Sequence, residues 1–249
     1  MLVVISPAKK LDMTQTDAVE ASNSPFYSKT EELVSVMKAL SSDEISQLMG
    51  ISANLANLNK DRFARFGTQD KKPAIYAFAG DTYQGLDAKT FADEDLIWAQ
   101  DHLRILSGLY GLLRPLDEIE PYRLEMGSRL KTDRGKNLYD FWGIELSTEL
   151  NNIATKTDTQ FLLNCASKEY FSAIDVKSLL LNVVTPVFLE NAASKPKVVS
   201  FYAKKARGAM ARFVIQNKIT TIEELMLFDA GGYAYQSDLS NEQMLYFVR

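Results

Sequence analysis

The chain has 249 residues, of which 46% are hydrophobic and 24% are charged, and its formal net charge is −4. This is the composition of an ordinary globular chain with enough apolar residues for a sizeable core. The single cysteine, Cys165, excludes an intramolecular disulfide framework, and the single histidine, His102, excludes the usual metal sites built from cysteine and histidine. Any bound metal would therefore have to rest on carboxylates, and we assign no metal ligands.

Hydropathy along the chain gives no sign of a membrane protein. In the first ten residues the lysines follow the apolar stretch, whereas the basic residues of a signal peptide precede it. The apolar stretch is also too short for the apolar region of a signal peptide. The longest apolar tract, residues 179–189, is broken by Asn182, Thr185 and Pro186, and it falls short of the roughly 20 residues that a membrane span needs. We expect a cytoplasmic protein without membrane contact.

The order of the predicted elements favours one α+β domain over residues 1–249, because no linker, low-complexity tract or repeat divides the sequence. Short apolar runs predict strands at residues 2–6, 74–78, 161–166, 183–189, 198–202 and 245–248. Helical periodicity predicts helices at residues 28–40, 42–49, 52–59, 91–103, 140–153, 168–176 and 203–217. Because the helices fall in unequal clusters, we predict a mixed β-sheet wrapped by helices rather than a regular doubly wound fold.

Residues 42–59 are typical of two short helices joined by a tight turn. Ser41 and Glu44 form a capping box, Gly50 can adopt positive φ, and Ser52 can cap a second helix whose Leu55 and Leu58 face inward. The pattern fits a plain αα-hairpin, a helix-hairpin-helix that grips phosphate, or a helix-turn-helix in which Asn54 and Asn57 face bases. Asp43 and Glu44 would repel DNA if they faced it, whereas Lys60, Arg62 and Arg65 restore positive charge.

Residues 104–127 form the densest local motif, in which glycines and prolines interrupt apolar residues. Arginines alternate here with acidic residues: Arg104, Arg114 and Arg123 with Asp117, Glu120 and Glu125. The arginine fork suits phosphate, and it also suits structural pairing with carboxylates. Structural pairing, a phosphate-facing role and an active site that uses Asp117 or Glu125 all fit this pattern.

Two strand ends carry polar turns. Ser167 caps a helix that begins with Glu169 and Tyr170 after the apolar run around Cys165, but no Ser-His-Asp or nucleophile-elbow arrangement is present. Residues 80–85 follow the run at 74–78, and they lack the Walker and dinucleotide-binding patterns. We therefore predict no cofactor.

Residues 191–222 contain seven basic side chains and no acidic one, which indicates an anion-binding surface. Helical periodicity places Ala203, Ala206, Met210, Phe213 and Val214 on one apolar face. The opposite face carries Lys204, Lys205 and Arg212 around Gly208, where a phosphate backbone could come close. Arg207 lies nearer the apolar boundary. A solvated basic face on an ordinary amphipathic helix is the alternative interpretation.

Five segments together resemble the YaaA-type peroxide-stress-resistance family, also designated UPF0246. They are Ile-Ser-Pro-Ala-Lys-Lys at 5–10, Ala-Gly-Asp-Thr-Tyr-Gln-Gly-Leu at 79–86, the arginine-rich motif at 106–127, Asn-Cys-Ala-Ser-Lys-Glu-Tyr-Phe at 164–171, and Tyr-Ala-Lys-Lys-Ala-Arg-Gly-Ala-Met-Ala-Arg at 202–212. The resemblance spans the chain in order.

The resemblance implies a bacterial cytoplasmic protein that is induced by hydrogen peroxide, limits damage from unincorporated iron and is associated with DNA repair. It implies an α+β domain of unusual topology with a positively charged cleft and a helix-hairpin-helix that binds duplex and branched DNA. It places the hairpin at 42–59 and makes further basic residues candidates for the cleft: Lys9, Lys10, Arg104, Arg114, Arg123, Lys204, Lys205, Arg207 and Arg212. No catalytic activity comes with it.

Two functional hypotheses follow. The first is a protective DNA-binding protein that recognises backbone and shape, with Gly50, Ser52, Lys60 and Arg62 of the hairpin among its contacts. The second is an enzyme that acts on a nucleotide or nucleic acid in a basic cleft, with acid-base or Mg²⁺-binding groups drawn from Asp117, Glu125, Glu169 and Tyr170. A partner-binding regulatory protein is a weaker third.

Overall fold

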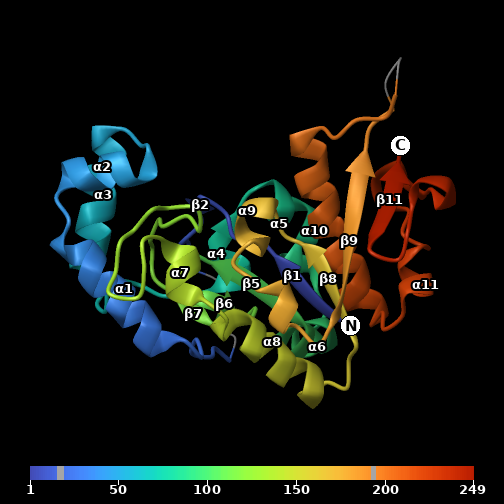
Figure 1. The fold of residues 1–249 in the computed structure, drawn as a ribbon, viewed down its shortest axis with the longest axis horizontal. Coiled ribbons are helices and arrows are strands. Elements are labelled where there is room, and N and C mark those ends of the chain that lie inside the picture. The colour runs from blue at the N-terminus through green and yellow to red at the C-terminus, as the bar shows by residue number, and fades with distance from the viewer. Residues whose placement is uncertain (16–19, 192–194) are drawn as a thin grey trace.

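The computed structural model describes residues 1–15, 20–191 and 195–249, and within them a seven-stranded sheet forms the centre of the fold (Figure 1). Its strand order is β10-β11-β9-β8-β1-β5-β6. These strands are β1 (Leu2–Ile5), β5 (Leu103–Ser107), β6 (Gly111–Leu113), β8 (Phe161–Cys165), β9 (Asn182–Leu189), β10 (Ala234–Tyr235) and β11 (Met244–Val248). Strands β11 to β5 run parallel, and antiparallel β10 and β6 form the two edges. The predicted mixed sheet is confirmed.

Strand β1 lies at the heart of the core. All four of its residues are buried, as expected for a strand that packs helices on both faces. Its neighbours are β5 on one side and β8 on the other, both parallel to it. The carboxyl ends of β1 and β8 therefore lie together, with Ile5 opposite Cys165. Cys165 is buried there, and burial raises the pKa of its thiol to about 12.

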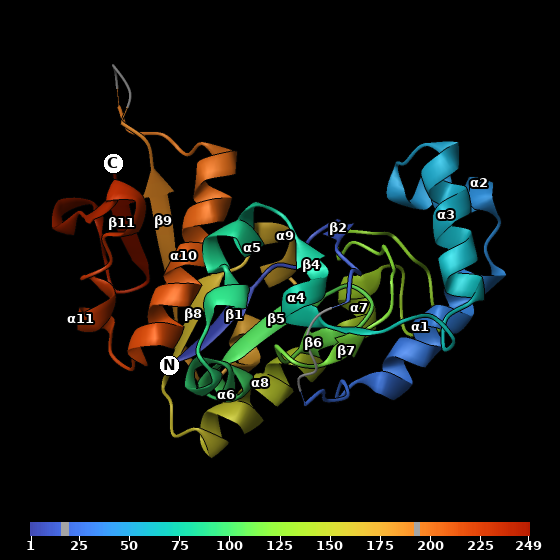
Figure 2. The ribbon, with the colours of Figure 1, turned by 180° about the vertical axis from the view of Figure 1, so that it is seen from behind.

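Helices cover both faces of the sheet. Figure 2 shows α5 and α10 together on one face, while α8 and α9 lie on the other. The helices are α1 (Tyr27–Ala39), α2 (Ser42–Met49), α3 (Ala53–Ala64), α4 (Ala74–Ala77), α5 (Asp81–Leu86), α6 (Asp93–His102), α7 (Leu138–Trp142), α8 (Glu145–Lys156), α9 (Lys168–Phe171), α10 (Ser200–Asn217) and α11 (Ile222–Leu225).

Smaller elements complete the domain. Two short antiparallel ladders join β2 (Lys10–Leu11) to β4 (Phe78–Ala79) and β3 (Lys72–Pro73) to β7 (Glu118–Ile119). Single 3₁₀ turns occur at η1 (Ala88–Thr90), η2 (Val176–Ser178), η3 (Ala230–Gly232) and η4 (Ser237–Leu239). Helices α1 to α3 extend away from the sheet at one end of the molecule in both views (Figures 1 and 2).

Two predicted strands are wrong. Residues 74–77 form helix α4, and only Phe78 belongs to a strand, β4, because a five-residue apolar run suits a buried helical turn as well as a strand. Residues 198–202 are not a strand, since α10 begins at Ser200 and only Lys197 pairs in an isolated bridge with Glu190. The helix therefore starts three residues earlier than predicted.

Strands β5 and β6 were not predicted. Their residues lie in the arginine-rich motif, where the glycines suggested an irregular loop. Gly111 does adopt positive φ (71°), but it does so at the first residue of β6, where the chain turns back on β5. Cβ-free residues at such a turn are compatible with a tight antiparallel pair.

Candidate nucleic-acid interface

Helices α2 and α3 form the predicted hairpin, and both helix starts are capped. Ser41 Oγ accepts from the backbone N–H of Glu44 (3.2 Å), while the Glu44 carboxylate accepts from the backbone N–H of Ser41 (2.7 Å). Gly50 ends α2 at φ 60°, in the left-handed region, and Ser52 Oγ caps α3 by accepting from the backbone N–H of Leu55 (3.4 Å). The capping box, the positive-φ glycine and the second cap are confirmed.

The turn end of this hairpin is exposed and uncharged. Residues 45–59 carry no charged side chain, and Gly50, Ser52, Ala53 and Asn54 are all exposed. Asp43 lies about 10 Å from Gly50 along the axis of α2, given a rise of about 1.5 Å per residue. Acidic groups at the start of α2 are thus separated from the amino end of α3, whose free N–H groups favour an anion.

The prediction that Leu55 and Leu58 face inward is wrong, since both leucines are exposed, by 40% and 42%. The buried residues of α3 are Ala56, Asn59 and Phe63, which share one face at helical spacing. Burial of the large Phe63 ring fixes the rotation of α3 and turns the leucines outward. They lie on the same outer surface as the exposed Asn54 and Asn57.

The basic residues of the hairpin lie at the far end of α3. Lys60 and Arg65 are exposed, whereas Arg62 is half-buried, and desolvation lowers the pKa of its guanidinium. Lys60 lies near enough to Glu44 for its charge to contribute to the lowered pKa of that carboxyl, after the hydrogen bonds from Ser41. Lys60 and Arg62 therefore flank the hairpin rather than its tip.

Two arginines of the arginine-rich motif serve the fold. Arg104 is 7% exposed and donates to the backbone carbonyls of Gln100 (2.9 Å) and Leu103 (2.7 Å), and burial lowers its pKa to about 10. Arg114 forms a two-pronged pair with the fully buried Asp117, at 3.0 Å from Nε and 2.8 Å from Nη2. Arg104 is buried and Arg114 is paired with Asp117. Neither arginine is therefore the exposed DNA contact that we predicted.

Asp117 is equally committed to the structure. Its carboxylate also accepts from Ser22 Oγ (2.6 Å) and from the backbone N–H of Arg114 (2.8 Å). The carboxylate is fully buried and accepts from four donors, three at Oδ1 and one at Oδ2, so it is held in place and out of reach of a substrate. Its candidacy as a catalytic group is therefore withdrawn.

Lys9, Arg123 and Glu125 form a small network beside the carboxyl end of β1. Glu125 Oε1 accepts from Arg123 Nη2 (2.8 Å) and lies 3.1 Å from Lys9 Nζ. The Lys9 side chain is 66% exposed, while those of Arg123 and Glu125 are about one-fifth exposed. The net charge of the three groups is positive, and Lys9 presents most of it to solvent.

Glu169 and Tyr170 open the short helix α9 nearby. Glu169 is exposed and accepts from the backbone N–H of Gly127 (2.9 Å), which ties α9 to the end of the arginine-rich motif. Tyr170 is buried, and burial raises the pKa of its hydroxyl, so the group stays protonated. Ser167 caps α9 as predicted, through the backbone N–H of Tyr170 (3.5 Å).

The prediction that Gly208 lies on an exposed basic face is wrong. Gly208 is buried against α5, and a Cβ built on it would lie 1.8 Å from the backbone oxygen of Thr82. Gly85 of α5 is the reciprocal contact, with its Cβ position 1.9 Å from the backbone oxygen of Lys205. The two glycines let the backbones of α5 and α10 touch, so Gly208 serves helix packing and offers no approach to phosphate.

The cations of α10 divide into two groups. Lys204 and Lys205 are exposed and make no hydrogen bond or ion pair within the described ranges. Arg212 instead donates to the carbonyls of Leu86 (3.1 Å) and Asp87 (2.8 Å) at the end of α5, where a cation is stabilised by the helix dipole. Arg207 is half-buried, and its Nε has no hydrogen-bond partner among the residues that are described.

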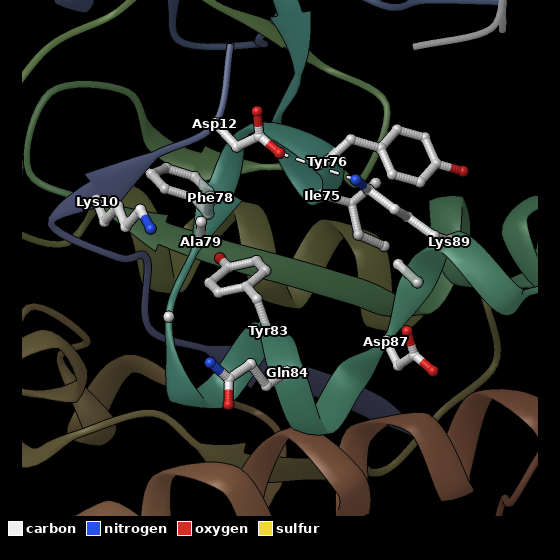
Figure 3. Close-up of a pocket in the computed structure, with 12 residues that line it drawn as sticks. Lys10, Asp12, Ile75, Tyr76, Phe78, Ala79, Tyr83, Gln84, Asp87 and Lys89 are labelled. Carbon is white, nitrogen blue, oxygen red and sulfur yellow. Dashed lines mark ion pairs between the residues drawn. The ribbon is translucent and has the colours of Figure 1, made fainter. Parts of the chain in front are cut away.

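Lys10 lies at a pocket of about 240 Å³ between β2, β4, α5 and η1 (Figure 3). Its floor is apolar, formed by Ile75, Phe78 and Tyr83, and Lys89 pairs loosely with Asp12 (3.8 Å) at its rim. Figure 3 shows Lys10 and Gln84 directed toward the cavity from two sides. Lys89 pairs with Asp12 and Asp87 pairs with Arg212 (3.8 Å), so Lys10 has no ion-pair partner of its own among the described residues.

Sequence reasoning missed several residues that shape this surface. Gly85 carried no signal of its own, because its role depends on the partner glycine 123 positions later in the chain. The apolar run at 198–202 predicts a strand that includes Phe201 and Tyr202, yet these residues are 51% and 42% exposed at the start of α10. Their position directly before Lys204 and Lys205 was the available signal, since aromatic and basic residues together are typical of nucleic-acid surfaces.

Within the described residues, no group of three or more histidine, cysteine, aspartate or glutamate side chains is placed to hold a metal ion. No described helix combines the length and the apolar character that crossing a membrane requires.

Comparison with known proteins gives a consistent result along the chain. The sequence profile described as "Peroxide stress protein YaaA" matches residues 1–239. UPF0246 proteins of Ruegeria pomeroyi and Dinoroseobacter shibae are each 53% identical over 253 residues, covering all of this chain and 98% and 95% of those proteins. A UPF0246 protein of Saccharophagus degradans is 46% identical over 254 residues, covering all of this chain and 99% of that protein. The chain belongs to the YaaA peroxide stress protein family.

Proposed function

We propose that this protein acts in the peroxide stress response by binding DNA through its phosphate backbone and shape. The observation that carries the proposal is the hairpin of α2 and α3, with an exposed, uncharged turn end and the free amino end of α3. A helix start with unpaired N–H groups is a natural phosphate site. Exposed lysines provide attraction along the rest of the surface: Lys9, Lys10, Lys60, Lys204 and Lys205.

The arrangement supports binding more than catalysis. The predicted catalytic carboxylates are engaged in structural contacts, Asp117 with Arg114, Glu125 with Arg123 and Glu169 with the backbone of Gly127. Tyr170 is buried and protonated. The exposed cations, by contrast, are distributed over several elements, as backbone binding requires.

The upper edge of the molecule in Figure 1 is the surface on which such DNA would lie. The hairpin, β2 with Lys10, α9 and the amino end of α10 all reach this edge, and they do so again in the reversed view of Figure 2. The hairpin lies at one end of the edge and α10 near the other. Phosphate contacts at several points of a rigid surface would fix the DNA without reading its bases.

The test is the salt dependence of affinity for unrelated duplexes. We expect log Kd to change steeply with log salt, with a slope of about 0.9 per phosphate neutralised, and equally for all sequences. A preference of about 10³-fold or more for one sequence would instead support a base-reading helix. Affinity that does not respond to salt would contradict backbone binding.

We further infer that bound protein shields DNA from iron-dependent oxidation. A protein that occupies the backbone and carries lysines toward it displaces cations from the DNA surface, including Fe²⁺. Nicking of plasmid DNA by Fe²⁺ and hydrogen peroxide should therefore fall as the plasmid becomes saturated with protein. Equal nicking with and without saturating protein would contradict this part of the proposal.

A further inference from the structure

A groove of about 420 Å³ runs between α5, α10 and η3, beside the pocket of Figure 3. Figure 2 shows α5 and α10 side by side along it. The chemically distinctive residues of its lining are Phe201, Tyr202, Lys205, Arg212, Tyr233 and Arg249. The groove shares Gln84 and Asp87 with the neighbouring pocket, so the two lie on either side of the same short helix.

Two aromatic rings are exposed at the amino end of α10. Phe201 and Tyr202 lie with ring centroids 5.4 Å apart and nearly edge to face, and Phe201 leaves half of its surface in water. The guanidinium of Arg249 lies over Tyr202 (4.5 Å) and over Tyr233 (4.8 Å). Adjacent exposed aromatic side chains are costly in water, and they indicate a surface that contacts a partner.

The charge around these rings is positive. Lys195, Lys197, Lys204 and Lys205 are exposed around the amino end of α10. Two carboxylates beside the groove are paired, since Glu190 lies 2.9 Å from Arg249 and Asp87 lies 3.8 Å from Arg212. The surface therefore offers aromatic faces to a planar apolar group and ammonium groups to an anion.

We propose that the amino end of α10 binds single-stranded DNA, with unpaired bases stacked on Phe201 and Tyr202 and phosphates on Lys204 and Lys205. Bases within a duplex hide their faces from a protein, so exposed rings gain stacking energy only from an unpaired strand. This inference rests on the proposed function and specifies it: the hairpin grips duplex backbone, and α10, toward the other end of the same surface, receives a separated strand.

The experiment compares two strands of equal length and charge by fluorescence anisotropy. One is oligothymidylate, and the other has the same phosphates but abasic sugars. We expect the wild-type protein to bind oligothymidylate about tenfold more tightly, the order of effect for one or two stacked bases. Equal affinity for both strands would overturn the proposal, because binding would then be electrostatic alone.

Substitutions assign the effect to the rings. Phe201→Ser and Tyr202→Ser should bring the ratio of the two affinities close to one, whereas Ile97→Ser should leave it unchanged. Ile97 is a matched control because it is also exposed, by 68%, but lies far from the two rings. It belongs to α6, whose Asp95 pairs with Lys218 at the carboxyl end of α10. Circular dichroism of each variant confirms the fold. An unchanged ratio in folded Phe201→Ser would overturn the proposal.

Duplex affinity, measured in parallel, separates this inference from the proposed function. Loss of base-dependent strand binding with intact duplex binding would overturn only the role of α10. Absence of duplex binding with base-dependent strand binding retained would overturn the hairpin as a duplex site and leave the role of α10 standing.

Discussion

Gly50 lies at the exposed turn of the hairpin and Gly208 at the buried contact between α5 and α10, and the two glycines serve different purposes. Gly50 adopts φ 60° at the end of α2, and a Cβ built on it meets nothing within 4 Å. Gly208 has helical geometry within α10, but a Cβ there would overlap the backbone of α5 at 1.8 Å. Position 50 favours glycine because the backbone adopts positive φ there. Position 208 needs glycine because a side chain would not fit between α10 and α5.

The difference explains which end of the molecule is free to touch DNA. The hairpin is attached mainly through α1, and its turn end faces solvent. Helix α10 is held over its length by α5 and the sheet, so only its amino end and its lysines are available. The basic residues that lie close together in the sequence therefore form only a narrow exposed surface, at the amino end of α10.

The largest effect on stability is expected at Gly208, where α10 packs against α5. Gly208→Ala should destabilise the protein by about 3 kcal/mol, because the backbones of α5 and α10 must separate to admit the methyl group. Urea unfolding followed by circular dichroism gives this value. A loss below about 0.5 kcal/mol would show that the helices do not touch at this position.

Removal of the lysine charges should affect binding without affecting the fold. The double variant Lys204→Gln and Lys205→Gln should weaken single-strand binding and reduce its salt slope by about 1.4, at about 0.7 per phosphate contact. Both side chains are exposed, so the free energy of unfolding should change by less than about 0.5 kcal/mol. Lys38→Gln on α1 is the control, and it should leave the slope unchanged.

Substitution of Gly50 should destabilise the protein less than substitution of Gly208. Gly50→Ala should destabilise by about 1 kcal/mol, because alanine strains at positive φ even where space is open. The comparison with Gly208→Ala under identical denaturant conditions is the measurement. Equal losses at both positions would contradict the distinction between conformation and space.

Substitution of Arg207 should have the smallest effect on stability. Arg207→Met keeps the apolar stem and removes the buried Nε that lacks a partner, so stability should stay within about 1 kcal/mol of the wild type, in either direction. Thermal unfolding measures the change. A loss of several kcal/mol would mean that the guanidinium holds a structural contact after all.

The sequence was informative where local rules decide the structure. Ser41, Glu44, Gly50 and Ser52 predicted the hairpin because caps and positive-φ turns depend on neighbouring residues. Four of the seven strands of the central sheet, β1, β8, β9 and β11, also followed from short apolar runs in the sequence. The predicted strand at 74–78 failed because five apolar residues do not distinguish a strand from a helical turn.

The candidate site was less predictable because its residues depend on distant partners. Arg104, Arg114, Lys204 and Lys205 were all candidates for the cleft, yet the two arginines are engaged internally and the two lysines are exposed. Gly208 seemed exposed on a helical wheel, which contains no information about α5 on its other side. Leu55 and Leu58 turned outward because Phe63 determined the rotation of α3.

The central claim is that the amino end of α3 grips phosphate, and Asn54→Asp tests it most directly. A carboxylate in the first turn of a helix is stabilised by the helix dipole, so the variant should be at least as stable as the wild type. The same charge should weaken duplex binding by about tenfold, whereas Asn57→Asp, one turn further along the exposed surface, should weaken it less. Duplex affinity at fixed salt, measured beside thermal stability, is decisive. Full affinity in a folded Asn54→Asp protein would contradict the account.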